Sequence, residues 1–182
     1  MDPQNVAAVA KHTEIAPTVS GNPIVLEALR ATPGLRERLT RGMHVADVGC
    51  GEGVSTVTMA LAFPHTRFLG IEADPACVER ARQLAAGCGV RNVYWLAAAA
   101  HQLAPRPTHD LICAFSGMHD VSDPRGELRA IRAALAEDGV YLRSEAADDA
   151  GGVCALAAEA GFARVDPVRV DNAAYRVFAL RR

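Results

Sequence analysis

Short apolar runs alternate with segments of helical period along most of this chain, and this alternation limits the possible folds. The first expected strand ends at Asp47, and four further strands are expected at 67–72, 93–98, 109–115 and 140–145. The segments expected to be helices span 54–63, 75–87, 124–138 and 149–160. Right-handed crossovers between parallel strands place helices on both faces of a sheet. The alternation therefore predicts an α/β fold with a mostly parallel, doubly covered sheet.

The two ends of the chain depart from this alternation. Residues 162–170 and 173–180 are two strand-like runs joined through Asp171 and Asn172, which predicts a closing hairpin and one antiparallel strand. Before the first strand, the stretch TPGLRERLTRG at 32–42 predicts one short helix. The residues that precede this stretch give no clear signal.

A glycine turn follows the first strand. The stretch VADVGCGEG at 45–53 places Gly49, Gly51 and Gly53 at alternate positions just after an apolar run. Glycine lets the backbone take positive φ and lets a ligand approach main-chain atoms that a Cβ would cover. Dinucleotide-binding turns have the spacing G-x-G-x-x-G. Here the spacing is G-x-G-x-G and an acid, Asp47, lies two residues before the first glycine, which favours a different nucleotide ligand.

Composition narrows the class of protein. The chain has 182 residues, half of them hydrophobic, which suits one domain with a full core. Its net charge is −2 and its arginines are scattered, so we expect no nucleic-acid partner. The five cysteines lack a CxxC pair and predict free thiols in a reducing compartment. Neither a signal peptide nor a membrane span is expected, so the chain is predicted to be cytoplasmic. The histidines lack metal-ligand spacing, so no metal site is expected.

Five motifs in order give the sequence a resemblance to class I S-adenosylmethionine-dependent methyltransferases, from Met43 to Arg182. The matching stretches are VADVGCGEGVST, FLGIEADP, HDLICAFSGMHDVSDP, LRAIRAALAEDGVYLRSE and LAAEAGFARV. The resemblance implies a Rossmann-like, seven-stranded sheet in the order 3-2-1-4-5-7-6, with strand 7 antiparallel. It also implies that residues 43–182 form the S-adenosylmethionine-binding domain and that residues 1–42 are an N-terminal helical extension.

The same resemblance implies a cofactor site. S-adenosylmethionine carries a positive sulfonium and no phosphate, so nearby carboxylates suit it. Asp47 would lie near the methionine ammonium, and Glu72 would accept the ribose hydroxyls. The alternatives are that Asp47 only caps the loop and that Glu72 is an ordinary acid at a strand end. The cofactor-binding residues implied are Asp47, Gly49, Cys50, Gly51, Glu72, Ala73, Ala99, Ala100 and Phe115.

Two departures from the family pattern concern the adenine and the acceptor. Ala98, Ala99 and Ala100 stand where the family often has an acid that bonds the adenine amino group, so backbone amides would have to replace it, and a lost bond costs about 1–2 kcal/mol. Only AADDAGG joins Glu145 to the next helix, so little chain covers the acceptor. The acceptor side could be completed by a large acceptor or by a second subunit in a homodimer, or the domain could bind without methylating.

Methyl transfer is an in-line displacement that depends mostly on positioning. His119, beside Asp120 after the fourth strand, is the candidate base, and His101 is a weaker one. The predicted function is methyl transfer to a hydroxyl, amine or carbon of a small molecule. A binding module without transfer activity, with a regulatory or partner-assisted role, is the main alternative, and a nicotinamide-dependent oxidoreductase is a third.

One further prediction concerns four apolar residues near the N-terminus. They either lie across the cleft or at a subunit contact, or they only cover the sheet near the first strand. The residues are Ile24, Val25, Leu26 and Leu29.

Overall fold

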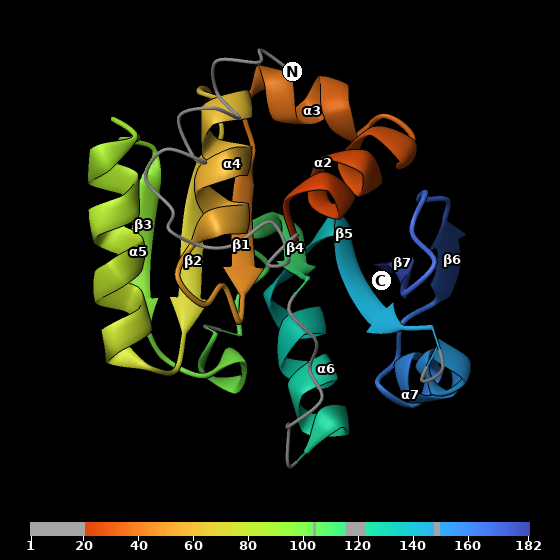
Figure 1. Ribbon diagram of the computed structural model, residues 1–182. Coiled ribbons are helices and arrows are strands. Elements are labelled where there is room, and N and C mark those ends of the chain that lie inside the picture. The colour runs from red at the N-terminus through yellow and green to blue at the C-terminus, as the bar shows by residue number, and fades with distance from the viewer. Residues whose placement is uncertain (1–20, 104, 116–122, 148–149) are drawn as a thin grey trace.

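A seven-stranded sheet forms the centre of the protein (Figure 1). The computed structural model describes residues 21–103, 105–115, 123–147 and 150–182. The strand order is β3-β2-β1-β4-β5-β7-β6, and β7 pairs antiparallel with both β5 and β6 while the other pairs are parallel. This order confirms the predicted class I arrangement. The strands are β1 (His44–Val48), β2 (Arg67–Glu72), β3 (Val93–Ala97), β4 (His109–Ala114), β5 (Leu135–Ala146), β6 (Arg164–Val168) and β7 (Tyr175–Arg181).

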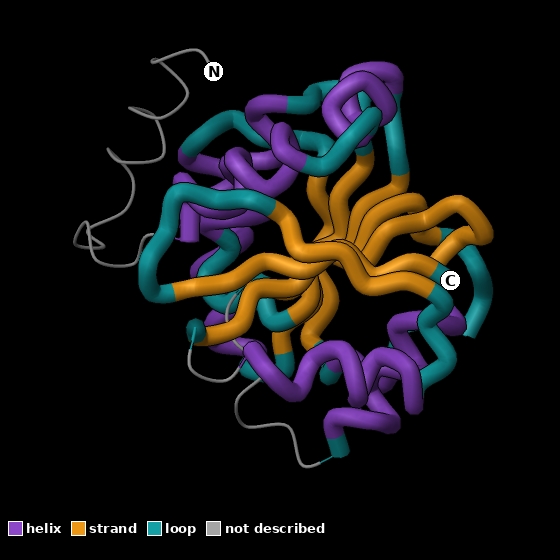
Figure 2. The backbone as a smooth tube through the Cα atoms, turned by 90° about the vertical axis from the view of Figure 1, so that its right-hand side faces the viewer, coloured by secondary structure: helices purple, strands orange, loops and turns teal. Residues whose placement is uncertain are grey.

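Helices cover both faces of this sheet (Figure 2). Alternate strand residues point to opposite faces, so each strand contributes to two cores. On one face, Val45 and Phe68 pack with the helices that lie early in the chain, and on the other face Ala46 and Ile112 pack with the later helices. The first group is α2 (Gly21–Ala31), α3 (Leu35–Arg41), α4 (Val54–Ala62) and α5 (Pro75–Gly87), and the second is α6 (Pro124–Ala134) and α7 (Val153–Glu159).

Two helices begin as the sequence predicts. The Asp74 carboxylate accepts from the Ala76 amide at 2.8 Å at the start of α5, and a proline occupies the first helical turn. Asp123 accepts from the Gly126 amide at 2.9 Å at the start of α6. An aspartate cap followed by proline satisfies amides that have no partner within the helix, which is why both starts could be located in the sequence.

The boundary between α6 and β5 differs from the prediction. The helix was expected to continue to residue 138, but it ends at Ala134, and β5 begins at Leu135. Leu135 is fully buried on the α6 face and pairs with His109, and the register then shifts before Leu111 pairs with Val140. The apolar position was therefore assigned to the correct core but to the wrong element.

The N-terminal apolar residues belong to the core. Ile24, Val25, Leu26 and Leu29 lie on α2, and all four are buried in a cluster with α3, α4 and one face of the sheet. The alternative in which they cover the sheet is confirmed, and a lid or subunit contact built from these side chains is wrong. No helix in the described part of the chain is long and apolar enough to span a membrane.

Shortening a side chain of this cluster should affect stability rather than binding. Leu29 is 1% exposed, so we expect Leu29→Ala to lower the free energy of unfolding by about 2–4 kcal/mol through a cavity in the core. Arg30→Ala, at the exposed next position, is the control and should change stability by less than about 0.5 kcal/mol. Urea unfolding measures both. A Leu29→Ala protein with unchanged stability but weakened cofactor binding would restore the lid interpretation.

Candidate cofactor site

The glycine turn lies at the carboxyl end of β1 and is tied to β2. Gly49, Gly51 and Gly53 have φ values of 66°, 54° and 81°. The amides of Gly49 and Cys50 both donate to the carbonyl of Ile71, at 2.8 and 3.1 Å. All three glycines adopt the left-handed backbone conformation, which is strained for any residue that has a Cβ.

The three glycines have different surroundings. A Cβ built on Gly49 or Gly51 would meet no atom within 4 Å, whereas one on Gly53 would lie 2.5 Å from the Trp95 ring and 2.8 Å from Ala81 Cβ. Gly53 therefore permits close packing of the turn against α5 and β3. Gly49 and Gly51 instead keep their backbone open to a ligand, as the sequence predicts.

Glu72, the last residue of β2, contacts this turn through its side chain. Its Oε2 accepts from the Gly51 amide at 3.0 Å, and its Oε1 accepts from the Asp74 amide at 3.1 Å. The half-buried carboxylate is thus held beside the open glycines by two backbone donors. Each carboxylate oxygen can accept a further hydrogen bond, so Glu72 remains able to bind hydroxyl groups.

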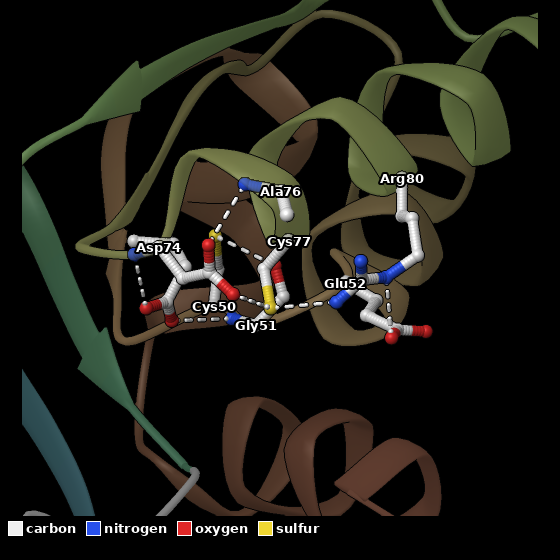
Figure 3. A network of polar contacts seen from close by, with 8 residues as sticks. Cys50, Gly51, Glu52, Asp74, Ala76, Cys77 and Arg80 are labelled. Atoms are coloured by element: carbon white, nitrogen blue, oxygen red, sulfur yellow. Dashed lines mark hydrogen bonds and ion pairs between the residues drawn. The ribbon is translucent and has the colours of Figure 1, made fainter.

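A surface network connects the turn to α5 (Figure 3). Arg80 pairs with Glu52 at 2.7 Å and also donates to the Cys77 sulfur at 3.0 Å. The Cys77 thiol in turn donates to Asp74 at 3.3 Å. Exposed ion pairs add little stability, so we expect this network to contribute little to the position of the turn.

Asp47 is held by two hydroxyls that the sequence analysis did not identify. Its carboxylate is 1% exposed and accepts from Ser55 Oγ at 2.7 Å and from Thr56 Oγ1 at 2.6 Å, both in the first turn of α4. Burial raises the pKa of Asp47 to about 6, against the opposing effect of the two hydrogen bonds. The available signal was a pair of adjacent hydroxyl residues that begins two positions after the third glycine. Asp47 therefore does fix the loop, and its buried charge would be stabilised by a nearby cation.

The raised pKa of Asp47 gives an expected pH dependence. The folded state holds the proton more tightly than the unfolded state, whose pKa is the ordinary 3.8, so stability falls as pH rises from about 4 to about 6. The contribution of this residue is about 3 kcal/mol across that window. Asp47→Asn cannot titrate, and its unfolding free energy should lack this fall. Urea unfolding of both proteins at pH 4.5 and 7 measures the difference, and parallel pH profiles would contradict it.

The backbone amides predicted to meet the adenine edge have partners within the chain. The Ala98 amide donates to the Glu72 carbonyl at 3.0 Å, which continues the pairing of β3 with β2. The Ala99 amide donates to Gln102 Oε1 at 2.8 Å and is therefore engaged within the chain. Gln102, which the sequence analysis missed, closes the short η1 turn (Ala100–Gln102), in which Ala100 is buried. An adenine edge would have to compete with Gln102 for the Ala99 amide.

The remaining predicted residues fall in three different settings. Ala73 is exposed at the bend between β2 and α5, and Cys50 is buried beneath the turn. Phe115 is buried after β4, and its carbonyl accepts from Ser144 Oγ at 3.0 Å. The candidate base His119 and its neighbour Asp120 lie outside the described residues.

A cavity of about 520 Å³ lies away from these residues. Thr32, Arg164, Arg169 and Arg181 are among its lining residues, which come from the end of α2 and from the β6–β7 region. None of the predicted site residues lines it. The cavity lies toward the β7–β6 end of the strand order, whereas the glycine turn joins β1 and β2, so the cavity has no part in the proposed cofactor site. Among the described residues, no group of three or more His, Cys, Asp and Glu is placed to hold a metal ion.

The strand order, the open glycine turn and the acid at the end of β2 together define the class I methyltransferase fold and site. A family model described as the methyltransferase domain matches residues 45–139, just over half of the chain. The chain belongs to this methyltransferase-domain family, and its cofactor is S-adenosyl-L-methionine.

One curated protein and two solved structures show what the chain is similar to. Trans-aconitate 2-methyltransferase of Paracidovorax citrulli is 32% identical over 107 residues, which are 58% of this chain and 39% of that protein. This chain thus spans about two fifths of the length of that curated relative. Among solved structures, a SAM-dependent methyltransferase from Aquifex aeolicus has a TM-score of 0.72 at 22% identity, covering 94% of this chain and 97% of that one. A TehB-like SAM-dependent methyltransferase from Corynebacterium glutamicum has a TM-score of 0.69 at 20% identity, with 98% and 97% covered. At such identities these structures establish the fold alone.

Proposed function

We propose that this chain transfers a methyl group from S-adenosylmethionine to a small-molecule acceptor. The observation that carries the proposal is the open cradle at Gly49 and Gly51 with the Glu72 carboxylate fixed beside it. When bound, the cofactor supplies a methyl group on a positively charged sulfur that leaves as a neutral thioether. The open glycine backbone leaves room for the methionine tail, and Glu72 accepts hydrogen bonds from the ribose hydroxyls.

The charges around the cradle support this cofactor over a dinucleotide. Asp47 and Glu72 place two carboxyl groups at the carboxyl ends of neighbouring strands. An acid at the position of Glu72 is common to both kinds of site, because it binds a ribose in each. Asp47 makes the difference: its charge would repel a pyrophosphate at the turn and would attract an ammonium.

The chain's contribution to catalysis is mainly positioning. β1 and β2 carry the proposed cofactor residues Asp47 and Glu72, and the family pattern implies that the acceptor side follows β4 in the sequence. His119 is the proposed base where an acceptor must lose a proton. We assign cofactor binding to residues 43–182 and regard residues 1–42 as an extension whose described helices complete the core. The five free thiols favour a cytoplasmic location.

The nature of the named relative suggests which acceptor to test first. The relative is a methyltransferase of trans-aconitate, a small acid with three carboxyl groups. We propose a small carboxylic acid of this kind as the acceptor. The connection after β5 is short, so we propose that a second subunit in a homodimer covers the acceptor. The alternative function is a protein that binds the cofactor without transferring its methyl group.

Two measurements test the function in sequence. Isothermal titration with S-adenosylmethionine, S-adenosylhomocysteine and NAD should show binding of the first two only. Transfer of a labelled methyl group to trans-aconitate and to a panel of hydroxyl, amine and carbon acceptors should then show turnover. Binding of NAD alone would overturn the cofactor assignment. Cofactor binding with no turnover on any acceptor would favour the binding module.

A further inference from the structure

A buried ion pair lies on β5, outside the cofactor residues. Arg143 and Glu145 are each 6% exposed and contact each other through Arg143 Nη2 and Glu145 Oε1. Both occupy a central strand, where charged side chains are rare unless they have partners or a function. Tyr141, two positions before Arg143, is fully buried against the α6 face, so the alternation of the strand puts all three side chains on that face.

The position of Arg143 relates it to the cofactor site. Arg143 pairs in register with Ala114, the last residue of β4, and the next residue, Ser144, bonds the Phe115 carbonyl. It therefore lies at the carboxyl edge of the sheet, where the glycine turn also lies. Strands β1 and β5 flank β4, so their spacing is about 10 Å. Arg143 is thus near enough to serve an acceptor that meets a cofactor bound at β1 and β2.

Two nitrogen atoms of the Arg143 guanidinium are hydrogen-bond donors without an acceptor in the described part of the chain. Nε and Nη1 are buried and have no hydrogen-bond partner among the described residues. Glu145 balances the charge through its contact with Nη2. A buried donor without an acceptor is unfavourable, and a guanidinium is planar and matches a carboxylate with two parallel bonds. An oxygen acceptor of that shape would satisfy the unused nitrogens.

A second acid near Arg143 is compatible with an anionic ligand. Glu127, in the first turn of α6, is buried. Burial raises the pKa of Glu127, and the charges of Arg143 and His101 oppose this shift. Glu127 therefore carries its negative charge less readily than an exposed glutamate, which is compatible with an anion bound at Arg143.

We propose that Arg143 is the specificity residue that binds a carboxylate group of the acceptor. This inference rests on the proposed transferase function and identifies the acceptor class as small carboxylic acids. It arises from the buried unused donors of Arg143, and the trans-aconitate relative agrees with it independently. Arg143 holds the acceptor in place and takes no part in moving the methyl group.

Titration calorimetry in the presence of saturating S-adenosylhomocysteine tests the proposal directly. The probes are trans-aconitate and tricarballylate, with the uncharged triamide of tricarballylate as the matched ligand. The full chain should bind at least one of the two acids and should not bind the triamide. Absence of acid binding would overturn the role of Arg143, whereas absence of S-adenosylhomocysteine binding would overturn the proposed function itself.

Variants then connect the acid binding to Arg143. Arg143→Met should weaken binding of the acid by about tenfold or more, while the affinity for S-adenosylhomocysteine stays within about twofold. Arg143→Lys, which keeps the charge but loses the planar fork, should lose part of the acid affinity. Equal acid affinity in Arg143→Met and in the unaltered protein would overturn the proposal.

A loss of folding must be separated from a loss of recognition. Arg143→Met leaves Glu145 buried without its partner, which can unfold the chain. The double variant Arg143→Met with Glu145→Gln removes both charges and should retain the fold, S-adenosylhomocysteine binding and the defect in acid binding. Arg125→Met with Glu159→Gln removes the exposed ion pair between α6 and α7 and is the matched control, with acid binding unchanged. A double variant at 143 and 145 that is folded and binds the acid normally would assign the pair a purely structural role.

Discussion

Gly51→Val should abolish measurable binding of S-adenosylhomocysteine in a protein that still folds. A Cβ at Gly51 projects into space with no protein atom within 4 Å, so the added branches would fill the volume proposed for the cofactor tail. We expect a loss of affinity of more than about 100-fold, equivalent to about 3 kcal/mol or more. The positive φ of 54° adds strain of about 1–2 kcal/mol to the folded state, which a domain of this size can tolerate.

Two other glycines supply the controls for this variant. Gly34 has φ 73° and nothing within 4 Å of its Cβ position, but it precedes α3 and is remote from the turn. Gly34→Val therefore introduces the same kind of strain and should leave binding unchanged. Gly53→Val should unfold the turn because Trp95 and Ala81 occupy the space. If Gly51→Val keeps its affinity, the turn is not the cofactor cradle, and if it loses the circular-dichroism spectrum of the fold, Gly51 is structural.

Glu72→Ala should weaken binding of S-adenosylhomocysteine by about 10- to 100-fold. Two charge-assisted bonds to the ribose would be lost, with a total effect of about 1.5–3 kcal/mol. The carboxylate also accepts from the Gly51 and Asp74 amides, so part of the loss would come from a less ordered turn. Calorimetric titration measures the change in dissociation constant.

Variants of the same turn separate these two contributions. Glu72→Gln keeps one oxygen acceptor without the charge and should have an intermediate affinity. Glu52→Ala removes the neighbouring acid, which pairs with Arg80 on the surface, and should change affinity by less than about twofold. A dissociation constant in Glu72→Ala equal to that of the unaltered protein would remove Glu72 from the site.

Much of the fold could be predicted because local signals and tertiary contacts agree. The strand at 67–72 has the predicted bounds, and the capped starts at Asp74 and Asp123 are found where expected. The end of α6 could not be predicted because Leu135 suits both a helix stripe and a buried strand, and only its pairing with His109 decides. Helix α2 was not assigned from the sequence, although Asn22-Pro23 near its start resembles the Asp-Pro starts of α5 and α6, and its packing in the core stabilises it.

The candidate site was predictable to a smaller extent. Asp47 and Glu72 stand out because acids at the ends of neighbouring parallel strands must meet at one edge of the sheet. The engagement of the Ala99 amide by Gln102 depends on a side-chain rotamer that no motif specifies. Arg143 and Glu145 were part of a strand motif in the sequence, and only the burial of that strand shows that their charges are enclosed.

The anchoring of the glycine turn to β2 has a consequence for the thermodynamics of binding. The Ile71 carbonyl accepts from the amides of Gly49 and Cys50, and the Glu72 carboxylate accepts from that of Gly51, so three successive amides are ordered by the protein alone. A ligand that meets a preorganised backbone loses less conformational entropy from the protein when it binds. The open glycines thus provide space without flexibility, and the intrinsic mobility of glycine does not have to be restrained each time the cofactor is exchanged.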